Sequence, residues 1–536
     1  MRSWSSAAEK VAVVFAFVGL IVATAWLLDQ VARHQFAVHL RNQAARALAL
    51  AATSATPYQW YFKNPDDLVA GRPFDTQSYD FVDGGLQLRS AGAPFEIGLR
   101  LTRPVDLRSF PQLRLEFDAG VGGEFVIVAR EKLGAPQCVS SAITFTGSRN
   151  ANAVDLASLT WHDQKDPDVA KPAPPTAALL RLRFLPAAAG SLLLRTAALQ
   201  RPDTYRPLDL GPTPVIVEAG SAPMSGQLAI YRLPFSEQSQ KVDIAAIVAN
   251  RDLSAVPLIA LPERGRVEQR IALRNAVYAA LPSAILIPEA DYERTVAKAR
   301  KLAANPVAPT STSTQWRLVA LFAAMLVFAR LRPPRQPRLR ALIEIVLTLT
   351  PIAWLILGGN VDGRMHAWQA ALIGITLAYA ASLSLPRTWR WNAGARAWVL
   401  ALLVVAMAVS IGLVFYESGS HLASAPGWRQ VLRYLGWALL QQYLMCAVCT
   451  ERWSVITGNF YVSAYLGALG FALLHTPNAA LMIATFVGGL CWCAIYLRYR
   501  ALLPLGVSHA ASALVLSTLL PVEILHSAEV SVRFFQ

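Results

Sequence analysis

The chain has 536 residues, of which 54% are hydrophobic and only 15% are charged. Soluble globular proteins carry about 25% charged residues, so this composition excludes an ordinary soluble enzyme. Five cysteines in so long a chain exclude a disulfide-stapled secreted scaffold, and the net charge of +15 is typical of proteins that bind either nucleic acid or a membrane.

The first apolar stretch predicts a membrane anchor over residues 1–30. Val11 to Leu28 contains no charged residue and follows Arg2 and Lys10. At about 1.5 Å per residue, a helix of this length spans the hydrocarbon of a bilayer. We expect the anchor to be retained. The alternative is a cleaved signal peptide, because Ala23-Thr24-Ala25 fits a cleavage site.

Residues 31–205 predict a β-sandwich of the jelly-roll kind. Leu113-Arg114-Leu115-Glu116-Phe117 and Leu180-Arg181-Leu182-Arg183-Phe184 alternate apolar and charged side chains. This period of two is typical of half-buried antiparallel strands, and turn residues separate further segments of the same kind. The strands are expected from about Pro73 to Pro202. An exposed loop at Trp161-His162-Asp163 is a weak candidate for sugar binding.

Residues 206–315 predict a small α/β module followed by a tether. Leu258 to Leu261 and Ala284 to Pro288 fit two strands, and Arg266 to Leu281 between them fits a helix. A second helix is expected from Ala290 to Ala304. Two outer modules therefore follow the anchor.

Residues 316–536 predict a membrane domain of eight helices. Its apolar stretches lie at about 316–330, 341–358, 366–385, 397–416, 428–449, 459–475, 478–497 and 501–520. Together with the anchor, they predict a multi-pass α-helical membrane protein with about nine transmembrane helices, an extracytoplasmic β-sandwich and a small α/β module.

Arginines crowd alternate loops of this membrane domain. One loop carries five of them: Arg330, Arg332, Arg335, Arg338 and Arg340. Because Lys and Arg concentrate in cytoplasmic loops, we expect a cytoplasmic N-terminus and an extracytoplasmic segment over residues 31–315, in the cell inner (plasma) membrane. The arginines of these cytoplasmic loops then account for most of the positive net charge, and the lipid bilayer is the expected partner. Nucleic acid is not expected as a partner, since the soluble part shows no basic patch with interleaved aromatics.

A few polar side chains fall inside the predicted spans, where a charge costs about 2.5–3.5 kcal/mol. They are Glu344, Gln441, Gln442, His475 and His509. Glu344 is expected to pair with Arg340 one turn away and to reach the membrane interface. The histidines and glutamines lie on three late spans and predict one shared polar site. The alternative for the glutamines is hydrogen bonding between helices alone.

The cysteines of the membrane domain are expected to pack rather than to bind metal. Cys446 and Cys449 lie on the glutamine span, and Cys491 and Cys493 lie two spans later. Residues two apart on a helix diverge by about 200°, so Cys491 and Cys493 cannot both face one zinc ion. No residue is assigned as a metal ligand.

Three short motifs follow one another on the late spans. Gln441-Gln442-Tyr-Leu-Met-Cys446 precedes Phe471-x-x-x-His475, and His509-x-x-x-Ala513 comes last. In this order they resemble the Glu-Glu-x-x-x-Arg, Phe-x-x-x-His and His-x-x-x-Asn motifs of the CPBP family of intramembrane proteases. That family includes the CAAX prenyl endopeptidases and the bacteriocin self-immunity proteins. The resemblance covers residues 428–520, and the first and third motifs are degraded.

The resemblance implies hydrolysis of a peptide bond in a membrane-embedded or lipid-anchored substrate. Carried over, His475 would position or activate water, His509 would face the oxyanion, and Phe471 would contact the substrate. Gln441 or Gln442 would occupy the place of the base. The cofactor is unknown, since zinc is implied by the family alone.

An amide cannot act as a base near neutral pH, so the missing glutamates leave three outcomes open. A histidine has become the base, another carboxylate such as Glu344 or Glu451 reaches the site, or the site only binds a peptide or lipid-linked group. We expect an intramembrane peptidase of altered chemistry. The alternative is a non-catalytic receptor or scaffold whose outer β-sandwich binds glycan or protein.

Overall fold

The structure is a computed structural model. It describes residues 7–53, 55–101, 103–132, 134–164, 166–218, 228–233, 256–305, 312–359, 365–383, 389–414, 416 and 427–520. Residues 306–311 of the expected tether lie outside this set. The chain divides into two compact units. One comprises Met1–His39, Arg266–Gln269 and Ala308–Gln536, and the other comprises Leu40–Gly265 and Arg270–Val307.

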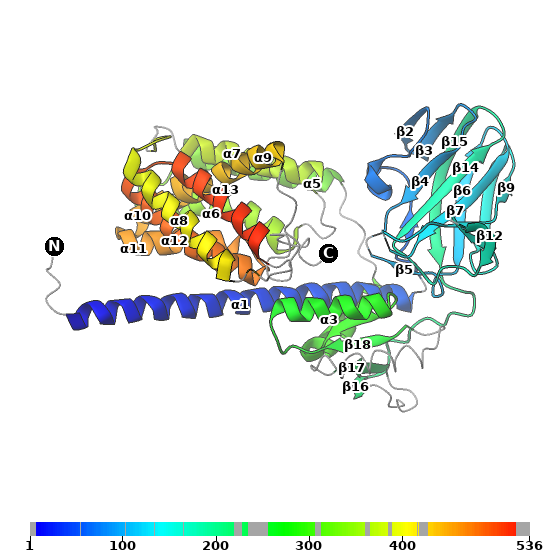
Figure 1. The fold of residues 1–536 in the computed structure, drawn as a ribbon, viewed down its shortest axis with the longest axis horizontal. Coiled ribbons are helices and arrows are strands. Elements are labelled where there is room, and N and C mark those ends of the chain that lie inside the picture. The colour runs from blue at the N-terminus through cyan, green and yellow to red at the C-terminus, as the bar shows by residue number, and fades with distance from the viewer. Residues whose placement is uncertain are drawn as a thin grey trace. The chain divides into compact units, whose positions relative to one another are not determined.

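Two antiparallel sheets make up the β-rich part of the second unit, and Figure 1 shows their strands as two layers. The described strands of one sheet are β1 (Gln59–Trp60), β2 (Ser78–Val82), β3 (Gly85–Ser90), β6 (Gln112–Ala119), β10 (Arg149–Asp155) and β15 (Gly190–Gln200). Those of the other are β4 (Phe95–Leu99), β7 (Gly123–Arg130), β8 (Cys138–Ser140), β9 (Ile143–Phe145), β11 (Trp161–Asp163), β12 (Asp166–Lys171) and β14 (Leu179–Pro186). The short strands β5 (Val105–Asp106) and β13 (Thr176–Ala177) pair separately.

The period-two alternation places one face of each sheet in a shared core. Phe117 on β6 and Phe184 on β14 are fully buried, and their ring centroids lie 5.5 Å apart. The charged neighbours point the other way, where Arg181 and Arg183 bind the carboxylate of Glu96 on β4 at 2.8 and 2.6 Å. The predicted alternation is therefore confirmed, and the two sheets form a β-sandwich.

Trp161 contradicts the expectation of an exposed aromatic loop. Its side chain is fully buried on β11, and its indole Nε1 donates a hydrogen bond to the carbonyl oxygen of Leu156 at 3.0 Å. A buried indole with a satisfied N–H is a core residue of the sandwich. Trp161 therefore presents no aromatic face to a sugar.

A four-stranded parallel sheet forms the rest of the second unit. Its order is β16 (Pro214–Glu218), β17 (Leu228–Arg232), β18 (Leu258–Leu261) and β19 (Ile285–Pro288). Helix α3 (Val267–Ala280) connects β18 to β19, as predicted, and α4 (Tyr292–Ala304) follows. Parallel neighbours need a crossover connection, and α3 provides it between β18 and β19.

Helix α1 runs from Ala7 to Ala52 and so extends well beyond the predicted apolar stretch. No glycine or proline interrupts the sequence from Asp29 to Ala52, which explains the continuation. Within the second unit, Ala44 and Leu48 of this helix belong to the core of the parallel sheet.

Each of the eight apolar stretches after residue 316 contains a described helix, although several of these helices begin or end a few residues inside the expected bounds (Figure 1). The helices are α5 (Thr312–Leu331), α6 (Pro337–Trp354) with the π-turn η4 (Leu355–Gly359), α7 (Ala367–Leu383), α8 (Ala395–Val414), α9 (Trp428–Gln442) with the π-helix η5 (Tyr443–Thr450) and α10 (Glu451–Thr457), α11 (Phe460–Leu473), α12 (Ala479–Tyr499) and α13 (Leu503–Leu519).

Five described helices are long and apolar enough to cross a membrane. They are Phe15–Ala52, Ser313–Leu331, Pro337–Leu357, Ala395–Val414 and Ala479–Tyr499. Helices α7, α11 and α13 are apolar but shorter. The protein is therefore a multi-pass α-helical membrane protein with a β-rich N-terminal region.

The glutamine span changes its helical form at the glutamines. α9 ends at Gln442, and the chain continues as η5 before α10 begins at Glu451. The hydroxyl of Thr450 donates to the carbonyl oxygen of Met445, five residues earlier, at 2.7 Å. π-Helical segments widen the turn and often occur at functional sites.

Glu344 pairs with two arginines and not with one. Its carboxylate binds Arg340 Nε at 2.8 Å, as predicted, and Arg452 Nε at 2.9 Å. Glu344 is only 8% exposed and is also held from a distant helix, and its expected reach to the membrane interface stays a prediction. Glu451 in turn binds Arg500. Both carboxylates that were candidates for a replacement base are therefore neutralised by arginines.

Candidate active site

Four of the predicted site residues line one cavity among the membrane helices. Gln441 is at the end of α9, Phe471 is on α11, His475 follows the end of that helix, and His509 is on α13. Gln442 is 1% exposed and reaches this group through His509. The structure therefore brings together residues from three helical segments that are widely separated in sequence.

Gln442 fixes the proton position on His509. Its amide nitrogen Nε2 lies 3.2 Å from Nδ1 of the imidazole, and both residues are buried. An amide nitrogen only donates hydrogen bonds, so Nδ1 of His509 is the acceptor. The neutral imidazole therefore carries its proton on Nε2 and can donate it to a ligand.

His475 has the opposite tautomer. Its Nδ1 lies 2.8 Å from the carbonyl oxygen of Phe471, one helical turn earlier. A carbonyl oxygen only accepts hydrogen bonds, so the proton of His475 is on Nδ1. The Nε2 of this imidazole keeps its basic lone pair. The two histidines thus offer one base and one hydrogen-bond donor.

Aromatic rings hold both imidazoles. The ring of Phe471 lies edge-on to His475 at 4.8 Å and to His509 at 5.5 Å between centroids. The indole of Trp492 lies 4.7 Å from the ring of His509 at an angle of 32°. Its Nε1 donates to Ser508 Oγ at 3.2 Å. Phe471 therefore packs against both imidazoles, and Trp492 supports one of them.

The sequence reasoning missed Trp492 and Ser508. Both belong to helices that carry recognised features, since Trp492 lies between Cys491 and Cys493, and Ser508 precedes His509. A tryptophan inside an apolar span needs an acceptor for its N–H, and this need is the signal that could have paired it with a hydroxyl on a neighbouring helix.

The departures from the family motifs also meet at this site. Cys446 Sγ donates to Gln442 Oε1 at 3.2 Å, so the positions of the motif's arginine and second glutamate are in contact but neutral. Ala513, at the position of the motif's asparagine, lines the cavity without a polar group. Both glutamates and the arginine of the first motif are therefore replaced by neutral residues, so no unpaired charge remains at these positions.

Zinc does not fit the residues present. A catalytic zinc ion is held by three protein ligands of the His, Cys, Asp or Glu type. In the described part of the chain, no group of three such side chains is placed to hold a metal ion. His475 and His509 alone provide one ligand too few.

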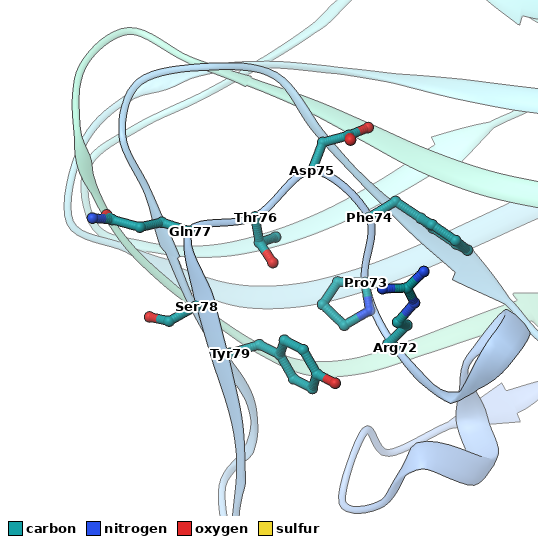
Figure 2. Close-up of a pocket in the computed structure, with 8 residues that line it drawn as sticks. All are labelled: Arg72, Pro73, Phe74, Asp75, Thr76, Gln77, Ser78 and Tyr79. Atoms are coloured by element: carbon teal, nitrogen blue, oxygen red, sulfur yellow. The ribbon is translucent and has the colours of Figure 1, made fainter.

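A second cavity, of about 430 Å³, lies in the β-sandwich against residues 72–79. Figure 2 shows Arg72 beside Phe74, with Asp75 directed away from both. The guanidinium carbons of Arg72 and Arg181 lie 5.8 and 5.2 Å from the ring centroid of Phe74. The chain's own arginines thus occupy the neighbourhood of this ring, which weakens it as a sugar platform.

A protein-family model described as type II CAAX prenyl endopeptidase, Rce1-like, matches residues 428–515. No curated protein matches the chain significantly. Among solved structures, the chain is similar to a family 11 carbohydrate-binding module from Clostridium thermocellum in complex with a beta-1,3-1,4-mixed-linked tetrasaccharide. The identity is 12% and the TM-score 0.19, over 23% of this chain and 82% of that chain. The family match confirms the resemblance that the motifs predicted, and residues 428–515 are the CAAX protease-like region of this membrane protein.

Proposed function

We propose that this protein is an intramembrane endopeptidase in which a histidine has taken the place of the glutamate base. The observation that carries the proposal is the opposite proton placement on the two imidazoles. His475 presents an unprotonated Nε2 and His509 presents an Nε2–H, as their partners Phe471 and Gln442 dictate. A base and an oxyanion donor are the two groups that hydrolysis of an amide requires.

In the proposed reaction, Nε2 of His475 takes a proton from a water molecule as the water oxygen attacks the peptide carbonyl carbon. The carbonyl oxygen gains the negative charge, and Nε2–H of His509 donates a hydrogen bond to it. When the tetrahedral intermediate collapses, the C–N bond breaks and the imidazolium of His475 gives its proton to the leaving amine. The products are a carboxylic acid and an amine, and both histidines return to their starting state.

The arginine pairs of Glu344 and Glu451 support histidine as the base. Each carboxylate already accepts hydrogen bonds from a guanidinium. A carboxylate held in this way is not free to reach the substrate, and neither residue lines the cavity of the two histidines. Loss of a general base costs about 10²–10⁴ in rate, and a histidine in its place restores part of that loss.

The proposed setting is the inner (plasma) membrane with nine spans, a cytoplasmic N-terminus and an extracytoplasmic segment over residues 31–315. The proposed modules are an anchor over 1–30, a β-sandwich over 31–205, an α/β module and tether over 206–315, and a membrane domain over 316–536. The substrate is a membrane-embedded or lipid-anchored peptide that the outer modules recruit or gate. A prenyl group on the substrate is not part of the proposal.

Profiling of peptide N-termini in membranes tests the proposal even while the substrate is unidentified. Cells with the wild-type protein are compared with cells that carry His475→Ala or His509→Ala at equal protein levels. New N-termini that depend on both histidines support the peptidase. If both variants keep the wild-type phenotype and deletion of residues 73–305 abolishes it, the peptidase is wrong and the non-catalytic receptor is favoured.

A further inference from the structure

The amide of Gln442 is held at both ends. Its Oε1 lies 3.2 Å from Cys446 Sγ, and its Nε2 lies 3.2 Å from His509 Nδ1. If the amide turned over, its NH₂ group would face the sulfur and its oxygen would face the imidazole. The imidazole would then have to carry its proton on Nδ1 to satisfy that oxygen. Each orientation of the Gln442 amide thus requires one particular tautomer of His509.

The thiol of Cys446 determines which orientation of the Gln442 amide is favoured. A thiol is a weak acceptor, so an NH₂ group pointing at the sulfur would be poorly satisfied in a buried site. The amide oxygen is a much better partner for the S–H. The observed orientation lets Cys446 donate to this oxygen and lets Gln442 donate to His509, and neither group is left without a partner in this arrangement.

The neighbouring cysteine leaves the Cys446 proton free for this role. Cys493 Sγ lies 3.3 Å from Thr450 Oγ1. Because the single hydroxyl proton of Thr450 goes to the carbonyl oxygen of Met445, Thr450 accepts the proton of Cys493. Cys446 also contacts Cys493, but a sulfur is a weaker acceptor than the oxygen of Gln442. The proton of Cys446 therefore points to the amide.

We infer that Cys446 is a positioning residue, whose thiol holds the Gln442 amide in the orientation that keeps the proton of His509 on Nε2. The role of this proton as the donor to the substrate carbonyl rests on the proposed function, but the tautomer itself does not. The inference also explains why a cysteine suits the position of the motif's arginine. A guanidinium beside the neutral amide of Gln442 would leave a buried charge without a counter-ion.

The test measures the tautomer directly. Solid-state NMR of the full-length protein, labelled with ¹⁵N-histidine in lipid bilayers, separates protonated from unprotonated ring nitrogens, and a His509→Gln sample identifies the signals of His509. Cys446→Ala removes the donor, Cys446→Ser keeps one, and Cys449→Ala is the matched control on the same π-helix. Should Cys446→Ala fail to fold, Cys446→Val removes the same donor and fills more of the space.

We expect protonated Nε2 of His509 in the wild type, Cys446→Ser and Cys449→Ala. In Cys446→Ala, the Nδ1–H form should gain roughly five- to tenfold in population relative to the Nε2–H form. On a cleaved peptide, kcat should fall in proportion to the Nε2–H population that is lost, at unchanged KM. The inference is overturned if Cys446→Ala keeps the wild-type tautomer, or if the wild type carries the proton on Nδ1. Absence of histidine-dependent cleavage would instead remove the proposed function and leave the tautomer result standing.

Discussion

Nε2 of Gln442 lies 3.2 Å from Nδ1 of His509, at the place where the CPBP motif has its second glutamate. A carboxylate there would accept a hydrogen bond from Nδ1–H, whereas the amide donates a hydrogen bond to an unprotonated Nδ1. The exchange of glutamate for glutamine therefore does more than remove a base. It reverses the direction of the hydrogen bond and moves the imidazole proton to the opposite nitrogen, Nε2.

Gln442→Leu should impair the chemical step. Without the amide, Nδ1 of His509 loses its buried donor and the imidazole no longer has a preferred tautomer. Because about half of the imidazoles then carry the proton on Nδ1, we expect kcat to fall by about twofold or more with KM nearly unchanged, in proteoliposomes with a cleaved peptide. Gln441→Leu is the matched control, since this glutamine lines the cavity and should change KM more than kcat. Equal effects of the two substitutions on kcat would contradict the assignment.

Arg452→Leu should unfold the membrane unit more easily. Arg452 is 9% exposed, and it binds the carboxylate of Glu344 as well as the carbonyl oxygen of Leu383, at 2.9 Å each. Its removal leaves a buried charge with only the half-exposed Arg340. The expected loss is about 3–5 kcal/mol, seen as a lower thermal midpoint in detergent.

The double variant Arg452→Leu/Glu344→Leu provides the control for this ion pair. Two apolar side chains leave no buried carboxylate without its partner, and Arg340 is half-exposed to solvent, so most of the lost stability should return. If the double variant is as unstable as Arg452→Leu alone, packing and not charge explains the loss.

Sequence periodicity predicted which residues are helical or alternate along a strand, because both patterns are local. The alternation of residues 180–184 and the helical stretches after residue 316 are examples. The order and spacing of the motifs likewise predicted that His475 and His509 line one cavity.

Partners far apart in sequence were not predictable in this way. Glu344 and Arg452 are 108 positions apart, and their pairing depends on how α6 packs against α10. The burial of Trp161 similarly depends on the second sheet, because a three-residue strand has too short a pattern to show which face is covered. The local sequence pattern shows which side chains share one face of a helix or strand, whereas tertiary packing determines which residues that face contacts.

Glu96→Gln should destabilise the β-sandwich at neutral pH but not in acid. Burial alone would raise the pKa of Glu96, but hydrogen bonds and charges from Arg181 and Arg183 hold the pKa below its usual 4.5. The folded state therefore prefers the ionised carboxylate. Its contribution to stability is present above the usual pKa and is lost as the pH falls through the lowered value.

We expect the midpoint of the outer-unit transition at pH 7 to be lower in Glu96→Gln by the equivalent of about 1 kcal/mol, with the difference shrinking below pH 4.5. Thermal scans of the purified protein between neutral and acidic pH check this. Glu116→Gln is the control, since its carboxylate is 47% exposed and lies 3.9 Å from Arg149. A pH-independent difference for Glu96→Gln would show that the arginine pair is not its cause.

Ser512→Ala should stabilise the membrane unit. Ser512 is 5% exposed, and its hydroxyl has no hydrogen-bond partner among the residues that the structure describes. A buried polar group without a partner costs about 1–3 kcal/mol, so its removal should raise the thermal midpoint by a few degrees. Ser517→Ala is the matched control on α13, because the hydroxyl of Ser517 donates to the carbonyl oxygen of Leu514 at 2.9 Å.

Ser512 also lines the cavity, three residues after His509. If Ser512→Ala raises the thermal midpoint and also lowers kcat, the hydroxyl contacts the substrate and lowers the stability of the fold. If the thermal midpoint falls, the hydroxyl has a hydrogen-bond partner in the fold and the expectation is wrong.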